Sequence, residues 1–385
     1  MTYGAIVLVG ASVALAASLI SLRLPGPIAQ PVPDRWHKKS TPVTGGFALL
    51  LGLLLALAAG AATGKAPPSV AYIAVGATAA FTIGFLDDKR SIGPRAKFVG
   101  QIAVAAGTAT AIHPHWLPVA ASIPLATFVL VAAMNSFNFL DNIDGLAAGI
   151  AGVAAGALAL TTLFAGGQAP RLLGCAAAGA CLGFLPLNYR PHRPARLFMG
   201  DSGSHLLGLV VAASALVATP GGAGGVAAAV VPPLLILALP ILDTSLVIIV
   251  RLAEGRPIWQ GGRDHISHRL VYIGLSEREA VGALLALAAA CSGVAVVVAA
   301  AHNPLVTGAA VGLVFALLVA LTSRLALVTG NGLEMDYVSV DDSAVPAAGT
   351  PISRDRILSE DLEGAVAELV SEPTPEVVED HARAN

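Results

Sequence analysis

The sequence predicts an all-α, polytopic integral membrane protein, and its composition and hydrophobic patterning are the observations behind that prediction. Of its 385 residues, 56% are hydrophobic and 12% are charged, whereas globular chains carry about 25% charged residues. The apolar residues come in blocks of about 17 to 25, the length of helix that spans a bilayer core. Because the blocks are apolar all round, without period-two alternation, we expect helices and not barrel strands.

The chain contains eleven such blocks, so we expect about eleven transmembrane helices. Most of them are rich in Ala, Val, Leu and Gly, and the block at 121–140 also holds polar Asn135 and Asn138 near its end. The expected spans are residues 2–24, 43–63, 68–86, 96–112, 121–140, 143–165, 171–188, 203–219, 226–250, 279–300 and 304–329.

Positive charge gathers on one side of this predicted bundle. The first block has no Lys or Arg ahead of its apolar core, so it lacks the basic start of a cleaved signal peptide. Arg35, Lys38 and Lys39 follow that block instead. With eleven spans, sixteen Lys and Arg residues fall on this side and only Lys65 and Arg171 on the other. The positive-inside rule then places the N-terminus outside and the first loop in the cytoplasm.

Charge also divides the chain into two parts. Residues 1–329 carry 19 Lys+Arg and 11 Asp+Glu, a net charge of +8, whereas residues 330–385 carry 3 and 13, a net charge of −10. We therefore expect one transmembrane domain over 1–329. The polar segment 330–385 is expected to be an acidic, mostly disordered cytoplasmic tail.

The acidic residues before the tail gather on the predicted cytoplasmic side, where only Asp243 among eleven falls inside a span. Carboxylates mixed with Arg, Lys and His on one face are suited to bind a divalent cation together with phosphates. The chain has no GxxxxGK[ST] loop, so an ATP-driven motor is not indicated. The polar groups concentrate in four segments, 84–101, 135–149, 188–208 and 261–276.

Several of these residues also have a simpler structural interpretation. A lone Asp before an apolar helix is more often an N-cap than a ligand, which fits Asp141 and Asp201 taken singly. Asp243 would be paired with Thr244 or with a neighbouring helix. Two other classes of function also stay open: a secondary transporter, which predicts acids near the bilayer centre and inverted repeats, and a scaffold whose acidic tail recruits partners.

The four segments, together with TPVTGG at 41–46, resemble a known family. NSFNFLDNIDGLAAG (135–149) resembles the NxxNxxDGxDGLA signature of the polyprenyl-phosphate N-acetylhexosamine-1-phosphate transferases. FLDD with a downstream Lys, FMGDSGSHLLG and the TPxxGG of TPVTGG also match this family in order, and the resemblance covers roughly residues 30–280.

The resemblance implies a multi-pass enzyme of a bacterial-type cytoplasmic membrane, with 1–329 as its transferase domain. Such an enzyme transfers a HexNAc-1-phosphate, here expected to be GlcNAc-1-phosphate, from a UDP-sugar to a polyprenyl phosphate. UMP leaves, and the product initiates a cell-envelope glycan. The expected cofactor is Mg²⁺, with Mn²⁺ as a substitute. The expected partners are the two substrates and the lipid bilayer, without nucleic acid, and a homodimer stays open.

The resemblance also assigns roles to individual residues. The catalytic set is Asp87, Asp88, Asp144 and His268; the substrate-binding set is Lys97, Asn135, Asn138, Asp141, Arg263, His265 and Arg269; the metal ligands are Asp201 and Asp88.

This chain departs from the family pattern at two positions. Asn142 stands where the family usually has Gly, and Asn tolerates the left-handed backbone that such a turn needs. Ser267 stands where the family usually has a histidine. That loss argues against the muramoyl-pentapeptide branch of the family, which remains the alternative. Because serine cannot carry a positive charge, we expect His265, His268 and Arg269 to make the phosphate contacts.

Overall fold

The computed structural model describes residues 2–24, 26–30, 40–64, 66–113, 118–190, 193–218, 225–259, 262–301 and 303–326. The chain divides into two units, Met1–Leu333 and Glu334–Asn385. The expected acidic tail at 330–385 lies outside the described residues, and all of the described residues belong to the first unit.

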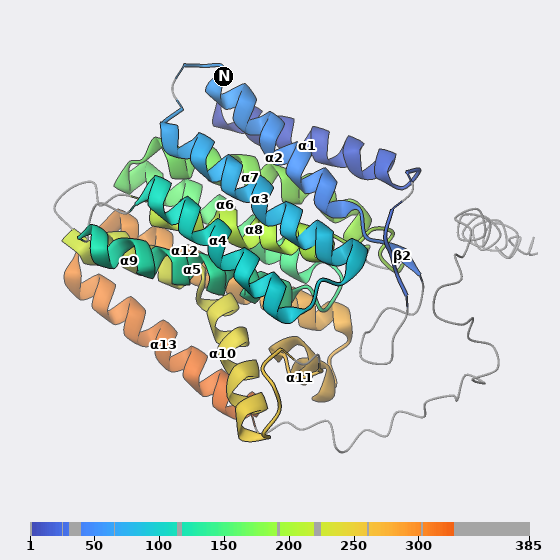
Figure 1. The fold of residues 1–385 in the computed structure, drawn as a ribbon. Helices are drawn as coiled ribbons and strands as arrows, with labels where there is room; N and C mark the ends of the chain where they lie inside the picture. Colours follow the sequence, from blue (N-terminus) through green and yellow to red (C-terminus); the bar gives the residue numbers. More distant parts are fainter. Residues whose placement is uncertain are drawn as a thin grey trace, which may run out of the picture. The chain divides into compact units, whose positions relative to one another are not determined.

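The described part of the chain is mostly helical (Figure 1). Its only departure from the all-α prediction is one short antiparallel pair, in which β1 (Ile28–Ala29) bonds β2 (Thr41–Pro42). The helices are α1 (Tyr3–Ser21), α2 (Gly45–Ala61), α3 (Pro68–Arg90), α4 (Pro94–Ile112), α5 (Val119–Leu140), α6 (Leu146–Ala165), α7 (Gln168–Asn188), α8 (Gly200–Leu216), α9 (Gly225–Ile236), α10 (Ala238–Ala253), α11 (Ile266–Tyr272), α12 (Glu277–Ala301) and α13 (Pro304–Ala326).

Seven of the described helices are long and apolar enough to cross a membrane, as expected of a polytopic membrane protein. These are α1, α3, α5, α6, α7, α12 and α13. The α9–α10 pair adds an eighth span if the two helices are counted together, and α2 is a shorter apolar helix. All eleven expected blocks coincide with helices in order, but α4 and α8 are not among the helices that are both long enough and apolar enough for a span. Eleven spans and their orientation therefore stay predictions.

The block expected at 226–250 is not one straight helix, because it bends by 64° between α9 and α10. Pro240 accounts for the position of the bend. Proline has no N–H to donate to the carbonyl four residues earlier, which belongs to Ile236, and its ring would meet that carbonyl. The helix therefore breaks at Leu237 and restarts as α10.

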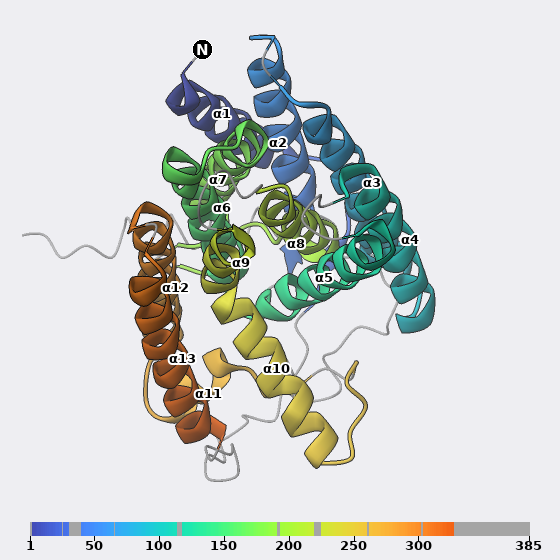
Figure 2. The same cartoon turned by 90° about the vertical axis from the view of Figure 1, so that its left-hand side faces the viewer.

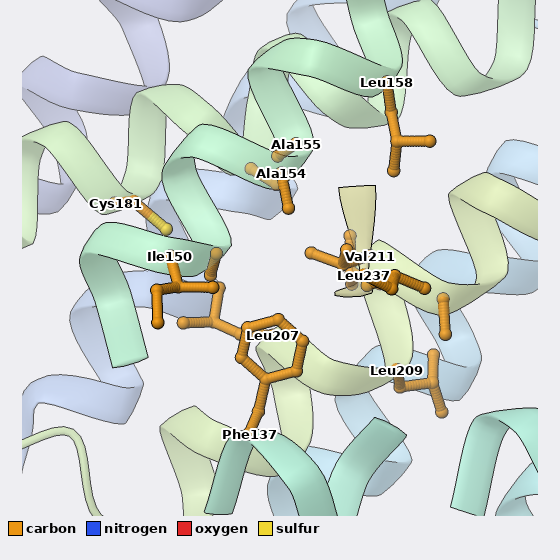
Figure 3. Packing of buried hydrophobic residues seen from close by; sticks show 14 of the residues in the cluster. Phe137, Ile150, Ala154, Ala155, Leu158, Cys181, Leu207, Leu209, Val211 and Leu237 are labelled. Atoms are coloured by element: carbon orange, nitrogen blue, oxygen red, sulfur yellow. The ribbon is translucent and has the colours of Figure 1, made fainter. Parts of the chain in front are cut away.

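Helix α8 lies in the middle of the bundle and contacts α2, α3, α5, α6 and α7 (Figure 2). Every residue from 202 to 215 is buried. The core that surrounds it is apolar, and Figure 3 shows Phe137 of α5, Ile150 of α6 and Leu207 of α8 in one cluster. Because all of its faces are covered by other helices, α8 forms a rigid support for the residues at its N-terminus.

Two glycines let neighbouring helices approach the first turn of α8 closely. A Cβ on Gly84 of α3 would overlap the Asp201 carbonyl, and a Cβ on Gly46 of α2 would overlap the Ser202 hydroxyl. Gly46 belongs to the TPVTGG segment, which is also tied to the chain before α8 by the bond from the Phe198 amide to the Pro42 carbonyl (2.9 Å). The backbone around Asp201 is therefore fixed by close packing.

Candidate active site

A cleft of about 770 Å³ lies where the ends of α3, α5, α7 and α10 meet the starts of α4, α6, α8, α11 and α12. Consecutive helices such as α3 and α4 run in opposite directions, so the end of one and the start of the next reach the same side. Of the residues assigned from the sequence, the cleft is lined by Asp87, Asp88, Lys97, Asn138, Asp141, Asp144, Asp201, His265 and His268. Asn135, Arg263 and Arg269 are not among its lining residues.

Two carboxylates from different helices share one lysine in this cleft. Lys97 of α4 forms ion pairs with Asp201 of α8 and with Asp87 of α3, the latter at 3.1 Å between Nζ and Oδ2. The other oxygen of Asp87 accepts a hydrogen bond from the Ile92 amide (2.9 Å), just after the end of α3. The ammonium therefore lies between two carboxylates that would otherwise repel each other.

Asp88 supports the start of α8. One of its carboxylate oxygens accepts the amide N–H of Asp201 (2.9 Å) and the other accepts that of Ser202 (3.1 Å). A carboxylate at a helix N-terminus satisfies amides that have no partner within the helix and interacts favourably with the helix dipole. Asp201 thus does not cap α8, because Asp88 from α3 fills that role, and the capping interpretation of Asp201 is wrong.

A layer of amide side chains and one buried histidine supports Asp201. Asn138 donates from Nδ2 to Asp201 Oδ1 (2.7 Å) and to Ser204 Oγ (3.2 Å). Asn135 lies one turn earlier on α5 and donates to Gln101 Oε1 (2.9 Å). The Gln101 amide in turn lies 3.0 Å from Nε2 of His205. Asn135 therefore acts through this layer and not by lining the cleft.

The segment between α5 and α6 forms another wall of the cleft. Asp144 Oδ2 accepts the Ala195 amide (3.0 Å). Burial raises the pKa of the Asp144 carboxyl above its usual value, and the bond from Ala195 opposes that rise. Asn188 joins the same two segments, because its Oδ1 accepts the Gly145 amide (2.9 Å) and its Nδ2 donates to the Leu197 carbonyl (3.0 Å).

His265 is held by an acid from α10. Its Nδ1 lies 2.7 Å from Asp243 Oδ2, while Asp243 Oδ1 accepts the Ile266 amide at 2.7 Å. The expected pairing of Asp243 with Thr244 is wrong, since Thr244 Oγ1 has no hydrogen-bond partner among the described residues. The other expectation, a contact with a neighbouring helix, is confirmed by the bond to the first residue of α11.

His268 and Ser267 follow on α11, and both are buried. Burial lowers the pKa of His268 to about 3, with the charges of His265 and Arg263 adding to the effect. Ser267 donates from Oγ to Asn142 Oδ1 (2.9 Å). The two positions at which this chain departs from the family pattern therefore contact each other, and their bond ties the α5–α6 segment to α11.

Arg269 has a structural contact that the sequence did not indicate. Its guanidinium donates to the carbonyls of Leu325 (2.9 Å) and Ala326 (3.2 Å) at the end of α13, and to the carbonyl of Asp264 (3.0 Å). A cation at a helix C-terminus satisfies carbonyls that have no partner within the helix. In this structure Arg269 thus joins α11 to α13 and lies outside the cleft lining.

Arg251 takes a position in the cleft that no sequence assignment had given it. It is 2% exposed, its guanidinium lies 5.3 Å from the ring centroid of Phe139, and it donates to Asp264 Oδ2 (3.0 Å). Arg256 bonds both oxygens of Asp264 as well. Burial acts to raise the pKa of Asp264, but the hydrogen bonds from Arg256 and Arg251 hold it below its usual value.

Comparison with known proteins shows which family this chain is similar to. A family model described as Glycosyl transferase family 4 matches residues 70–219. The decaprenyl-phosphate N-acetylglucosaminephosphotransferase of Mycobacterium tuberculosis (strain ATCC 25618 / H37Rv) is 34% identical over 295 residues, which cover 66% of this chain and 72% of the relative. The chain belongs to glycosyl transferase family 4.

Two further relatives differ in how much of this chain their similarity covers. The decaprenyl-phosphate N-acetylglucosaminephosphotransferase of Mycolicibacterium smegmatis is 34% identical, with 66% of this chain and 71% of the relative covered. The phospho-N-acetylmuramoyl-pentapeptide-transferase of Geobacillus thermodenitrificans is 35% identical, but only 48% of this chain and 64% of the relative are covered. Likeness to the acetylglucosamine enzymes thus extends over more of the chain.

The carboxylates of the cleft fit one particular way of holding a divalent cation. Among the described residues, no three His, Cys, Asp or Glu side chains are grouped as a complete metal site. Mg²⁺ is usually bound by one or two carboxylates together with substrate phosphates and waters. The Asp88 carboxylate contacts the backbone amide of Asp201, and the Lys97 ammonium between Asp87 and Asp201 shows that the cleft accommodates positive charge. These residues fit a cation shared with a substrate.

Helical spacing could have indicated two of the residues that sequence reasoning missed. Gln101 follows Lys97 by four residues and His205 follows Asp201 by four, so each pair shares one helix face. Arg251 and Asp243 gave no comparable signal, because their partners come from segments distant in the sequence. Their contacts depend on the bend at Leu237 and on the chain that returns to α11.

Proposed function

We propose that this chain transfers GlcNAc-1-phosphate from UDP-GlcNAc to a polyprenyl phosphate, releases UMP and so initiates a cell-envelope glycan. Its membership of glycosyl transferase family 4 and the activity for which its mycobacterial relatives are named support the proposal. The observation that carries it is the cleft, in which carboxylates, a lysine, two histidines and Arg251 meet at one end of an apolar bundle. Family membership also favours a transferase over a transporter or a scaffold.

In the proposed reaction, an oxygen of the polyprenyl phosphate attacks the phosphorus that bears the sugar, and the bond from that phosphorus to UMP breaks. Positive groups stabilise the charge that spreads over the phosphate oxygens during such a transfer. His265, His268 and Arg251 line the cleft and are the groups that would contact the diphosphate. Asn138, Asp141 and Asp144 would orient the nucleotide sugar from the opposite segment.

The contacts of the two adjacent acids favour Asp87 over Asp88 as the base that takes any remaining proton of the lipid phosphate. Both oxygens of Asp88 accept backbone amides of α8. The Asp88 carboxylate is therefore engaged at both oxygens in holding the start of α8. Asp87 has one oxygen on the Ile92 amide and the other on Lys97, whose ammonium can move to a phosphate oxygen.

Asp201 and Asp88 are the residues that would hold Mg²⁺ or Mn²⁺ together with the donor's phosphates. A divalent cation there would neutralise charge that develops on the transferred phosphoryl group. Lys97 would then be displaced from Asp201 and retain its bond to Asp87. This order of contacts lets one lysine balance the carboxylates in the free enzyme and contact phosphate in the loaded one.

The proposed site faces the cytoplasm. The cleft lining includes Arg190, Arg193, Arg251 and Arg278, all of which the positive-inside count placed on the cytoplasmic side. The proposed location is therefore the cytoplasmic membrane of a bacterium, with the cleft open to soluble UDP-sugars and adjacent to the acyl region that holds the lipid substrate. Whether the chain forms a homodimer is a separate question, which the mass of the purified particles answers.

The test uses the full chain, purified in lipid nanodiscs with a short polyprenyl phosphate. UMP release is measured with UDP-GlcNAc, UDP-GalNAc and UDP-MurNAc-pentapeptide, each with Mg²⁺, with Mn²⁺ and with excess EDTA. We expect release with UDP-GlcNAc only when both the lipid and a divalent cation are present. Release confined to UDP-MurNAc-pentapeptide would assign the chain to the alternative branch, and release without lipid would refute transfer to a lipid phosphate. The mass of the particles gives the oligomeric state.

A further inference from the structure

Asp243 is a buried acid to which the proposed reaction gives no role. It lies on α10, one turn after Pro240, and its side chain is 2% exposed. Both of its oxygens face the same short segment, since Oδ2 lies 2.7 Å from His265 Nδ1 and Oδ1 accepts the Ile266 amide at 2.7 Å. A buried carboxylate on an otherwise apolar helix is costly unless it is fully hydrogen-bonded, and these two contacts satisfy it.

The contact with His265 determines which ring nitrogen carries the proton. An ionised carboxylate can only accept hydrogen bonds, so Nδ1 must donate. The ring is also held from its sides, because it meets the edge of Phe139 at 5.8 Å and the His268 ring at 5.4 Å between centroids. With Nδ1 turned to Asp243, the nitrogen left for the cleft that His265 lines is Nε2.

The contact with the Ile266 amide determines where α11 begins. His265 is the N-cap residue of α11 and makes no side-chain cap bond itself. Asp243 supplies that cap from α10, which satisfies one of the amides at the start of the helix. His268 lies on the first turn of α11, three residues after His265, so its place depends on where that turn starts. One carboxylate therefore fixes the ring of one histidine and the backbone that carries the other.

We propose that Asp243 is a positioning residue for His265. It keeps Nδ1 as a donating nitrogen and directs Nε2 towards the phosphates of the nucleotide sugar. When Nε2 takes up a proton and donates it to a bound diphosphate, Asp243 balances the positive charge of the ring. A carboxylate behind a histidine is known to set both ring orientation and tautomer in this way. The inference rests on the proposed function for the identity of the ligand, but the tautomer of His265 is independent of it.

Asp243→Asn separates this role from a purely structural one. Asparagine is nearly the same size, and its carbonyl can still accept the Ile266 amide, so the cap of α11 is retained. Its NH₂ group, however, would then face His265 and donate. Nδ1 must become the acceptor and the proton moves to Nε2. We expect kcat/KM for UDP-GlcNAc to fall about ten- to a hundredfold, with the loss of a correctly oriented cation as its cause.

Two further variants make the result specific. Thr244→Val is the matched control, since Thr244 is the next residue on α10 and its hydroxyl has no hydrogen-bond partner among the described residues. We expect this variant to have wild-type activity. Asp243→Asn combined with His265→Gln should be no more than about twofold worse than His265→Gln alone, because a positioning residue has nothing left to position once its histidine is gone.

The tautomer itself is read by nitrogen NMR of the protein with ¹⁵N-labelled histidine in nanodiscs, at about pH 9, where imidazoles are neutral. The signal that disappears in His265→Gln identifies His265. We expect its proton on Nδ1 in the wild type and on Nε2 in Asp243→Asn. The same tautomer in both proteins, or losses that multiply in the double variant, would overturn the inference. Failure of wild-type enzyme to release UMP from any donor would instead refute the proposed function, while the tautomer result would still stand on its own.

Discussion

Asp201→Asn should separate catalysis from stability, because the structure gives Asp201 almost no part in holding α8. The amides at the start of α8 are bonded by Asp88 and are unaffected. The side-chain carbonyl of the substituted asparagine can still accept from Asn138, and Lys97 retains Asp87 at 3.1 Å. What is lost is one partly exposed ion pair, which contributes about 0.2–1 kcal/mol to the free energy of unfolding. The variant should therefore insert and melt nearly as the wild type does.

The loss of turnover should be far larger. If Asp201 holds the cation and its charge is needed in the transition state, removal should slow UMP release about 10²- to 10⁴-fold, which corresponds to about 3–5 kcal/mol of activation free energy. The assay is UMP release in nanodiscs, paired with a thermal melt of the same sample. Asp88→Asn is the contrast, because its NH₂ group would face one of the two α8 amides, at an added cost of about 1–3 kcal/mol in stability.

Two outcomes would refute this reasoning. Turnover within a few-fold of wild type in Asp201→Asn would show that the charge of Asp201 is not needed for transfer. A large fall in melting temperature for Asp201→Asn, equal to that of Asp88→Asn, would show that Asp201 holds the start of α8 after all.

Three further predictions concern α11 and the orientation of the bundle. Ser267→Ala should change turnover only a few-fold, since it removes one neutral hydrogen bond to Asn142 worth about 0.5–1.5 kcal/mol; a loss as large as that of His268→Ala in the same UMP assay would contradict this. The pKa of His268 is lowered to about 3 in the folded chain, against about 6.5 in the unfolded chain. Below pH 6.5 the unfolded chain therefore binds a proton at His268 more readily than the folded chain does. The contribution of neutral His268 to the free energy of unfolding is present above pH 6.5 and is lost as the pH falls towards 3. Melting temperatures of His268→Gln should accordingly decline less with acid than those of the wild type, and parallel curves would count against it. Finally, in intact cells a membrane-impermeant maleimide should label a cysteine placed at Arg171 and not one placed at Arg193, and the reverse pattern would place the cleft on the outer side.

Much of the fold could be predicted from the sequence because a membrane helix is recognisable from the composition of its own segment. Length and apolarity are properties of a single segment, so each expected block coincides with a helix. The bend at Leu237 was missed although Pro240 is visible in the sequence. A proline inside an apolar helix can be accommodated without a break when neighbouring groups satisfy the freed carbonyl, and only the packing shows whether they do.

The sequence indicated some residues of the site and missed others, and the two groups differ in where their contacts come from. Residues at helix ends, such as Asp87 and Asp201, meet because antiparallel helices bring their ends to the same side. The roles of Asp243, Arg251 and Arg269 depend on which distant segment each side chain reaches, and no local pattern encodes that. Arg269 illustrates the difference, since no local pattern indicated that it donates to the carbonyls of Leu325 and Ala326, and its expected contact with phosphate stays a prediction.

The bond between Arg269 and the end of α13 has a practical side for anyone who handles this protein. The carbonyl of Ala326 accepts a hydrogen bond from Arg269, which lies on the same short helix as His268. A fluorescent protein or affinity tag fused directly behind Ala326 would pull on the histidine segment, and activity lost in this way would be mistaken for a failure of catalysis. An affinity tag is therefore better placed away from the end of α13.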